Sequence, residues 1–304
     1  MRPSMEMKEK ELSDYLKLEN PLGHKNQFER EMVEIFHENS KQSPATCALV
    51  EREINSHLYV EEKIREDARN YKRYFYNDAQ PLPESGDLTR PLTDLFQNRC
   101  SERNFVKEPL TDQQISDIFS GLQVTRRAIP HSNVNVDLDY RAYPSAGRLY
   151  PVETYVLRPE QGSEQWRCFH YQADDHSLTL VNDDLTVEEV SMCLRDNVGI
   201  VSKAGAIVVF TAMFERVLDK YGILGYRFPF IEAGGMAQHI SLAATDIELS
   251  SVIWGGMLDD RLNKILNIDG FSETAILSMF VGKKDKTKND LSRPTYAAKE
   301  SPNA

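Results

Sequence analysis

The chain has 304 residues, 40% of them hydrophobic, and a formal net charge of -11. This length can bury a substantial core, while the negative charge argues against general binding to a nucleic-acid backbone, which requires a basic face. The start is charged throughout and the longest apolar run, AGAIVVFTAMF, is too short to span a bilayer, so we expect a cytoplasmic protein that does not bind a membrane.

Residues 1–90 are rich in Glu, Lys and Asn with interspersed apolar positions, as in FEREMVEIFHENS, a pattern that predicts amphipathic helices. The segment NDAQPLPESGDLTRPL then carries several Pro residues and a Gly, which indicates a boundary near residue 90. We expect a mostly helical accessory region at 1–90, a main domain at 91–285 and a polar, disordered tail at 286–304.

Two guanidinium groups and a hydroxyl gather within five residues after this boundary, at Arg99, Ser101 and Arg103. Such a set can hold a phosphate through bidentate hydrogen bonds, although an ordinary solvated loop would have the same composition. A helix is expected next. Thr111 is its predicted N-cap, and Gln114 completes a capping box before a stripe of apolar residues.

The stretch YPSAGRLYP, residues 143–151, predicts a shaped loop. Pro144 and Pro151 exclude a helix, and Gly147 tolerates backbone angles that other residues avoid. Only small side chains cover the backbone amides of Ser145–Gly147, so these amides could donate hydrogen bonds to a flat ligand. A tight connector without any ligand would look the same.

Alternating apolar residues predict strands at 152–159 and 166–183, the latter with a turn at 174–176, and a buried strand follows at 204–213. The next helix, FERVLDKY, has Tyr221 on its apolar face, with Lys220 about a quarter turn away and Gly222 placed to end it. Lys220 and Tyr221 could both be structural.

Paired glycines occur twice in the last third of the chain. Gly234–Gly235 lies in the helix that we expect from Glu232, where close helix packing is the favoured explanation. Gly255–Gly256 follows the strand SSVIW, where either a tight turn or a closely approaching ligand would require glycine. A helix at 259–268 and a strand at 275–282 complete a pattern without a regular βαβ repeat, which predicts an α+β domain.

The order of RCSERNF, YPSAGRLYP, FERVLDKYG, EAGGMAQHISLAATDIEL and VIWGG resembles the flavin-dependent nitroreductase superfamily. The combination of PSAG-x-LYP with a later Lys-Tyr pair is more similar to the azoline dehydrogenases that mature thiazole/oxazole-modified peptides, of the microcin B17 and streptolysin S type. The resemblance covers roughly residues 95–285. It implies a nitroreductase-like central sheet flanked by helices, with a helical N-terminal extension.

The resemblance also implies bound FMN and a homodimer with its flavin sites at the subunit interface. The implied FMN contacts are Arg99, Ser101 and Arg103 to the phosphate and ribityl chain, Pro144, Ser145, Ala146 and Gly147 to the isoalloxazine, Gly255 and Gly256 near flavin N5, and Lys283 as the C-terminal phosphate contact. Arg103 is also a candidate for the cation that stabilises the reduced flavin near N1.

The implied reaction is oxidation of peptide thiazolines or oxazolines to thiazoles or oxazoles. Lys220 or Tyr221 would remove the Cα proton while the flavin accepts a hydride from Cβ. The implied partners are an azoline-containing precursor peptide and the cyclodehydratase subunits of a synthetase, which residues 1–90 would contact. Two alternatives stay open: an NAD(P)H-dependent nitro or quinone reductase of the same fold, and a non-catalytic scaffold subunit of the cyclodehydratase complex.

Overall fold

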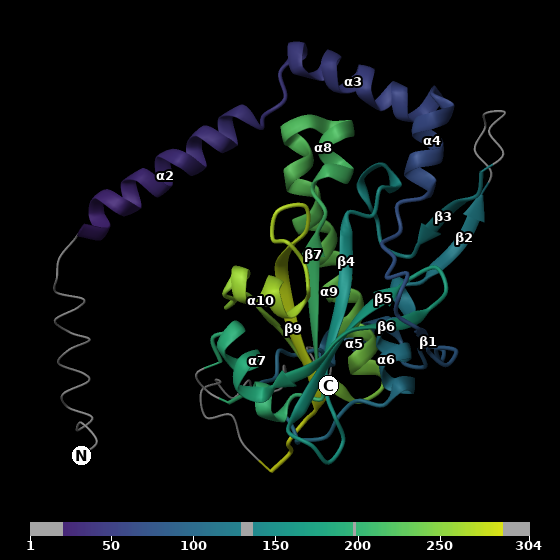
Figure 1. Ribbon diagram of the computed structural model, residues 1–304, viewed down its shortest axis with the longest axis vertical. Coiled ribbons are helices and arrows are strands. Elements are labelled where there is room, and N and C mark those ends of the chain that lie inside the picture. Colours follow the sequence, from purple (N-terminus) through teal and green to yellow (C-terminus); the bar gives the residue numbers. More distant parts are fainter. Residues whose placement is uncertain (1–20, 129–135, 197–198, 288–304) are drawn as a thin grey trace, which may run out of the picture. The chain divides into compact units, whose positions relative to one another are not determined.

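A computed structural model describes residues 21–128, 136–196 and 199–287 (Figure 1). The helices are α2 (Pro21–Asn39), α3 (Pro44–Tyr59), α4 (Glu61–Ala68), α5 (Leu92–Asn98), α6 (Asp112–Ile118), α7 (Val187–Cys193), α8 (Glu215–Tyr221), α9 (Phe228–Asp246) and α10 (Asp259–Ile265). The strands are β1 (Ala79–Pro81), β2 (Val124–Ala128), β3 (Leu138–Arg141), β4 (Val152–Pro159), β5 (Gln165–Gln172), β6 (Ser177–Thr186), β7 (Ala206–Ala212), β8 (Leu249–Trp254) and β9 (Thr274–Lys283).

Seven strands form one sheet in the order β1-β6-β5-β4-β7-β9-β8, and every neighbouring pair is antiparallel. Strands β2 and β3 form a separate antiparallel pair. The predicted α+β class, with a central sheet flanked by helices, is confirmed. None of the described helices has the length and apolar character needed to cross a bilayer.

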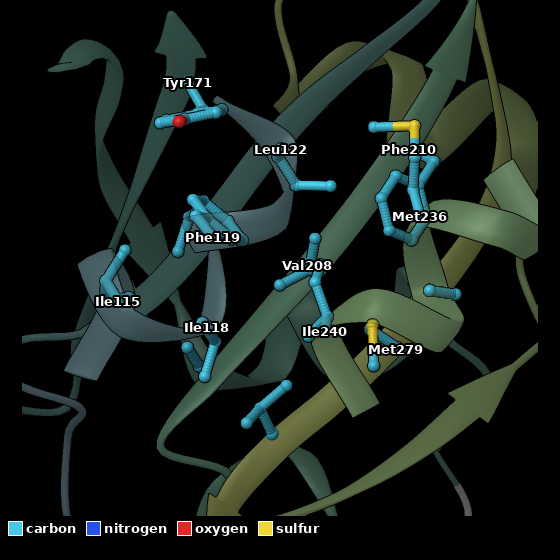
Figure 2. Close-up of a cluster of buried hydrophobic side chains, with 14 of the residues drawn as sticks. Ile115, Ile118, Phe119, Leu122, Tyr171, Val208, Phe210, Met236, Ile240 and Met279 are labelled. Carbon is cyan, nitrogen blue, oxygen red and sulfur yellow. The ribbon is translucent and has the colours of Figure 1, made fainter. Parts of the chain in front are cut away.

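The central strand β7 is buried on both faces, as its unbroken apolar run predicted. Because successive side chains of a strand point to opposite faces, Val208 and Phe210 join one hydrophobic cluster, whereas Ile207 and Val209 join another. Figure 2 shows the first cluster, in which side chains from α6 and α9 cover β7 and β9. Helices α7 and α10 contribute side chains to the second cluster.

Helix boundaries follow the local signals that the sequence carries. Thr111 and Gln114 form the predicted capping box at the start of α6, and a second capping box, which the sequence reading missed, joins Thr186 and Glu189 at the start of α7. Gly222 ends α8 with a φ of 57°, a left-handed value that favours glycine.

By its internal contacts the chain divides into two compact units, Met1–Glu51 and Arg52–Ala304. Residues 52–90, which the sequence reading placed in the accessory region, therefore fold as part of the second unit. Tyr71 donates a hydrogen bond to Asp139 (2.7 Å), and Lys72 is paired with buried Glu273 (2.5 Å). Beyond its first two residues, the tail predicted at 286–304 lies outside the described residues.

Candidate active site

Three buried side chains, those of Tyr143, Leu149 and Tyr150, anchor the loop between β3 and β4 in the core. Ser145 Oγ accepts a hydrogen bond from the backbone N–H of Tyr150 (2.9 Å), and the Arg216 guanidinium donates to the Tyr150 carbonyl (2.8 Å). These bonds hold a backbone that turns through positive φ three times, at residues 147, 148 and 150. The predicted shaped loop is present, and the buried side chains and these two hydrogen bonds determine its conformation.

The tip of this loop faces away from the core. Pro144 and Gly147 are exposed, and Ser145 and Ala146 are partly exposed. The backbone N–H groups of Ala146 and Gly147 donate to no residue in the described part of the chain. The loop therefore offers unsatisfied donors on an accessible surface, as a ligand-binding loop requires.

Helix α8 brings Lys220 and Tyr221 against this tip. A Cβ atom added to Gly147 would lie 2.5 Å from Tyr221 Oη and 2.9 Å from Lys220 Nζ, closer than real Cβ contacts come. Gly147 also has a φ of 59°. The backbone angle at position 147 thus favours glycine, and any side chain there would displace the tips of Lys220 and Tyr221.

Lys220 is the more deeply buried member of the pair, with only 4% of its surface exposed, while Tyr221 is half-buried. This burial does not follow from the spacing within α8, which left a structural and a functional role open. The reason is tertiary: the side of α8 that carries Lys220 is covered by the loop and by Asp67 of α4, whose Oδ2 lies 4.0 Å from Lys220 Nζ.

Burial lowers the pKa of Lys220 because it penalises the ammonium form. The Asp67 carboxylate acts against this change, and the Arg148 guanidinium adds to it. Burial raises the pKa of Tyr221, so its phenol is neutral near pH 7. The Tyr221 ring packs edge-on against Phe228, with ring centroids 5.0 Å apart. The pair thus combines an amine of reduced basicity with a fixed neutral hydroxyl.

A buried carboxyl group supports the loop from α9. Glu232 accepts a hydrogen bond from the Val152 N–H (3.4 Å), while its Oε2 has no partner among the described residues. Burial raises the pKa of Glu232 to about 7, although nearby Arg141 opposes the rise. The sequence reading treated Glu232 only as the start of a helix; one carboxylate among apolar and small residues was the available signal.

The glycine pair that follows Glu232 borders open space in the described part of the chain. A Cβ atom at Gly234 or Gly235 would meet nothing within 4 Å among the described residues. The close helix packing that we expect at these glycines therefore involves no described residue of this chain. The exposed residues Phe230 and Ile231 precede them on α9, so this part of the helix presents an apolar and small surface outward.

The phosphate-type residues lie beside β8. Ser101 forms an isolated bridge with Ser251, and the Glu102 N–H donates to the Ser251 carbonyl (3.0 Å). Glu102 turns inward, where Lys284 lies 3.0 Å from it. The side chains of Arg99, Ser101 and Arg103, by contrast, form no hydrogen bond or ion pair with any described residue. Their polar groups are therefore available to a ligand.

Two further predicted positions occupy opposite ends of β8 and β9. Gly255 follows β8 and is exposed, and a Cβ atom there would meet nothing within 4 Å in the described residues. The Gly256 carbonyl accepts from Trp254 Nε1 (3.0 Å), which shapes the turn. Lys283, at the other end, is paired with Glu108 (3.2 Å), and both side chains are mostly exposed.

Strand register separates these residues into two groups. Ser101 pairs with Ser251, and Ser251 lies on the row of Ala206 at the start of β7. The loop instead leads into Val152, on the row of Ala212 at the end of β7. The two rows are six positions apart along β7, which corresponds to roughly 20 Å along the sheet. Figure 1 shows α8, which carries Lys220 and Tyr221, beyond that second end of β7 and β4.

The sequence profile of the nitroreductase family matches residues 96–283. MJ1384 of Methanocaldococcus jannaschii, a nitroreductase-type protein, is 30% identical over 205 residues, which cover 67% of this chain and 95% of that protein. The microcin B17-processing protein McbC of Escherichia coli is 30% identical over 149 residues, 47% of this chain and 54% of McbC.

Two solved structures share the fold. A nitroreductase-type protein of Ralstonia eutropha is 21% identical with a TM-score of 0.55, and the match covers 68% of this chain and 89% of that one. A chain of the E. coli microcin synthetase McbBCD complex with truncated pro-MccB17 is 23% identical with a TM-score of 0.51, over 84% of this chain and 97% of that one.

Proposed function

The chain belongs to the nitroreductase family, and on this basis we propose that it oxidises thiazolines or oxazolines in a ribosomally made peptide to thiazoles or oxazoles, with FMN as the electron acceptor. One observation carries the proposal: Lys220 and Tyr221 converge on the tip of the Gly147 loop. This is the combination of motifs by which the sequence resembles azoline dehydrogenases. The similarity to McbC supports the same class of substrate.

Three observations indicate that the residues at the proposed site are suited to bind FMN. The N–H groups of Ala146 and Gly147 lack partners, open space lies above Gly255, and the side chains of Arg99, Ser101 and Arg103 are unpaired among the described residues. Pro144–Gly147 would lie against the isoalloxazine, Gly255–Gly256 would pass near N5, and Arg99, Ser101 and Arg103 would hold the phosphate and ribityl chain. When bound, the flavin accepts a hydride at N5.

Lys283 is the least supported of the proposed contacts. Its ammonium is already paired with Glu108. Lys283 lies at the same end of the sheet as Ser101, and we retain it as a phosphate contact if Glu108 releases it on binding.

In the proposed reaction, aromatisation removes one proton from Cα and one hydride from Cβ of the azoline ring, and no other bond breaks. Lys220 takes the Cα proton, because a buried amine with a lowered pKa retains a larger fraction of its free-base form near neutral pH. The neutral Tyr221 hydroxyl orients the ring beside it. The pair lies directly beneath the exposed tip of the loop, against which a peptide would bind.

We further propose a homodimer in which the loop of one subunit faces Arg99–Arg103 of the other. Within one chain the two groups are separated by roughly 20 Å along the sheet. The outward-facing Gly234–Gly235 surface permits close approach of a second α9. Mixed dimers of Arg99→Ala and Lys220→Ala chains test this arrangement, since a shared site leaves one of the two sites intact, whereas a site within one chain leaves none.

A synthetase partner is the third part of the proposal. The unit Met1–Glu51 carries exposed apolar residues on α2, namely Met32, Val33 and Ile35. We propose that this helix, and not the whole of residues 1–90, docks on a cyclodehydratase subunit. Removal of residues 1–43 should abolish co-purification with that subunit and leave flavin content unchanged; retained co-purification would contradict the docking role.

An NAD(P)H-dependent nitro or quinone reductase is the second candidate, favoured by the 95% coverage of MJ1384. Anaerobic mixing separates the two functions. An azoline peptide should bleach the flavin band in one turnover, with a mass loss of two hydrogens per ring, whereas NADH and NADPH should bleach it slowly. Rapid bleaching by a nicotinamide and none by the azoline would establish the reductase. A protein without flavin would favour the scaffold role.

A further inference from the structure

Helix α4 places a carboxylate beside the buried amine of Lys220. Asp67 is the last residue but one of α4 and is itself only 7% exposed. Its Oδ2 lies 4.0 Å from Lys220 Nζ. Among the described residues, Asp67 is the only carboxylate that forms an ion pair with Lys220. A segment far from the family's motifs thus reaches the centre of the proposed site.

A histidine holds this carboxylate in place. His57 of α3 is 6% exposed, and its Nδ1 lies 3.2 Å from Asp67 Oδ1 and 3.1 Å from Oδ2. The other ring nitrogen lies 3.4 Å from Asp219 Oδ2, on the α8 residue that precedes Lys220. The His57 ring therefore lies between two carboxylates, and its contact with both Asp67 oxygens fixes the orientation of that group.

The remaining charges near this cluster lie at its edges. Lys63 contacts Asp219 (2.7 Å) and Glu66 (3.2 Å) at the surface. The Arg148 guanidinium, from the loop, lowers the pKa of Lys220 through its charge, and the Tyr221 ring centroid lies 5.9 Å from Lys220 Nζ. One carboxylate and one guanidinium therefore shift the pKa of Lys220 in opposite directions.

We propose that Asp67, oriented by His57, is a positioning residue that holds the Lys220 amine at the loop tip and sets its protonation. This inference rests on the proposed function, in which Lys220 is the base. Charges about 4 Å apart and shielded from water interact far more strongly than exposed pairs do. The balance between Asp67 and Arg148 then keeps Lys220 basic enough to take a proton and neutral often enough to do so.

This role predicts opposite effects for two neutralising variants. Asp67→Asn removes the charge that favours the ammonium, so the titration midpoint of Lys220 should fall by about 1 pH unit or more. Arg148→Gln removes the charge that disfavours the ammonium, so the midpoint should rise. If Asp67 only anchors α4, the titration midpoint of Lys220 should not shift in opposite directions in the two variants.

The midpoint can be read without any substrate, which separates this inference from the proposed activity. In protein with 13Cε-labelled lysine, the Lys220 signal is the one absent from Lys220→Ala. We expect that signal to titrate below those of exposed lysines in the wild type, and lower still in Asp67→Asn. Glu66→Gln is the matched control, because it removes a charge from the same helical turn at a residue that faces Lys63; it should leave the signal unmoved.

Flavin bleaching by an azoline peptide provides the second readout. Asp67→Asn should move the acidic limb of its pH profile lower by the same amount and reduce the plateau rate several-fold, since a weaker base transfers a proton more slowly. Asp67→Glu, which keeps the charge, should restore the limb. If Asp67→Asn fails to fold, His57→Gln serves instead, and should lower the midpoint by a smaller amount. An unchanged Lys220 midpoint in these variants would overturn the proposal.

Discussion

Gly147 and Tyr221 approach each other so closely that a single methyl group at position 147 would lie 2.5 Å from the Tyr221 hydroxyl oxygen. The contact joins a loop before β4 to the end of the helix after β7. It explains why the glycine of PSAG and the later Lys-Tyr pair occur in one sequence: the loop tip and the pair form a single surface.

Gly147→Ala should reduce azoline oxidation strongly while lowering stability only modestly. The loop holds position 147 at a left-handed backbone angle, which costs an alanine about 1–2 kcal/mol, and the added methyl group displaces the tips of Lys220 and Tyr221. Gly162→Ala is the control, because Gly162 has a φ of 77° with nothing within 4 Å. Both variants should lose similar unfolding free energy in urea, and only Gly147→Ala should lose activity. Equal activities would show that the contact is irrelevant to function.

Lys220→Ala and Tyr221→Phe should each retain flavin and lose turnover. Removing a positioned base costs on the order of a hundredfold or more in rate. The Tyr221 hydroxyl bonds no described residue, so Tyr221→Phe should leave stability within about 0.5 kcal/mol of the wild type. Single-turnover bleaching is the measurement, with exposed Lys264→Ala as the control. Wild-type rates in both variants at full occupancy would assign the pair a structural role.

Arg99→Ala should weaken flavin retention without changing the fold. Loss of one charge-assisted phosphate contact should raise the Kd for FMN by about ten- to a hundredfold. Arg167→Ala removes a guanidinium whose partner is Glu160 and should have no effect on the Kd. Fluorescence titration of the apoprotein with FMN measures both, and release of FAD instead of FMN on denaturation would refute the cofactor assignment.

Gly234→Leu should disrupt the proposed dimer and spare the fold of the chain. Within one chain a side chain at this position meets nothing nearby, and leucine favours a helix more than glycine does. Sedimentation velocity should show dimers for the wild type and monomers with reduced flavin content for the variant. A flavin-loaded wild-type monomer, or an intact variant dimer, would place the interface elsewhere or remove it.

Glu232→Gln should flatten one part of the dependence of stability on pH. The folded-state pKa of Glu232, about 7, exceeds the ordinary value of 4.5. The protonated carboxyl group therefore stabilises the fold fully below pH 4.5, and this stabilisation is lost as the pH rises through 7. Relative to the wild type, the variant should gain about 2–3 kcal/mol of unfolding free energy between pH 5 and pH 8. Urea unfolding at both values measures the difference, and parallel curves would contradict the shifted pKa.

Local signals in the sequence determined much of this protein. The capping box at Thr111, the termination of α8 at Gly222 and the doubly buried strand β7 each depend on side chains within a few positions, and each was predicted. The α+β class and the need for glycine at 147 followed from the same kind of information. Such features can be read from the chain because the interactions that favour them are local.

The tertiary structure alone decided how the site is assembled. The burial of Lys220 depends on α4 and the loop lying on the same side of α8, which the helical periodicity of α8 does not record. The approach of Asp67, the separation of Arg99–Arg103 from the loop and the empty space beside Gly234 likewise depend on strand order and helix packing. A sequence pattern records which face of an element is apolar, but the neighbour that covers a face is chosen by contacts between distant segments.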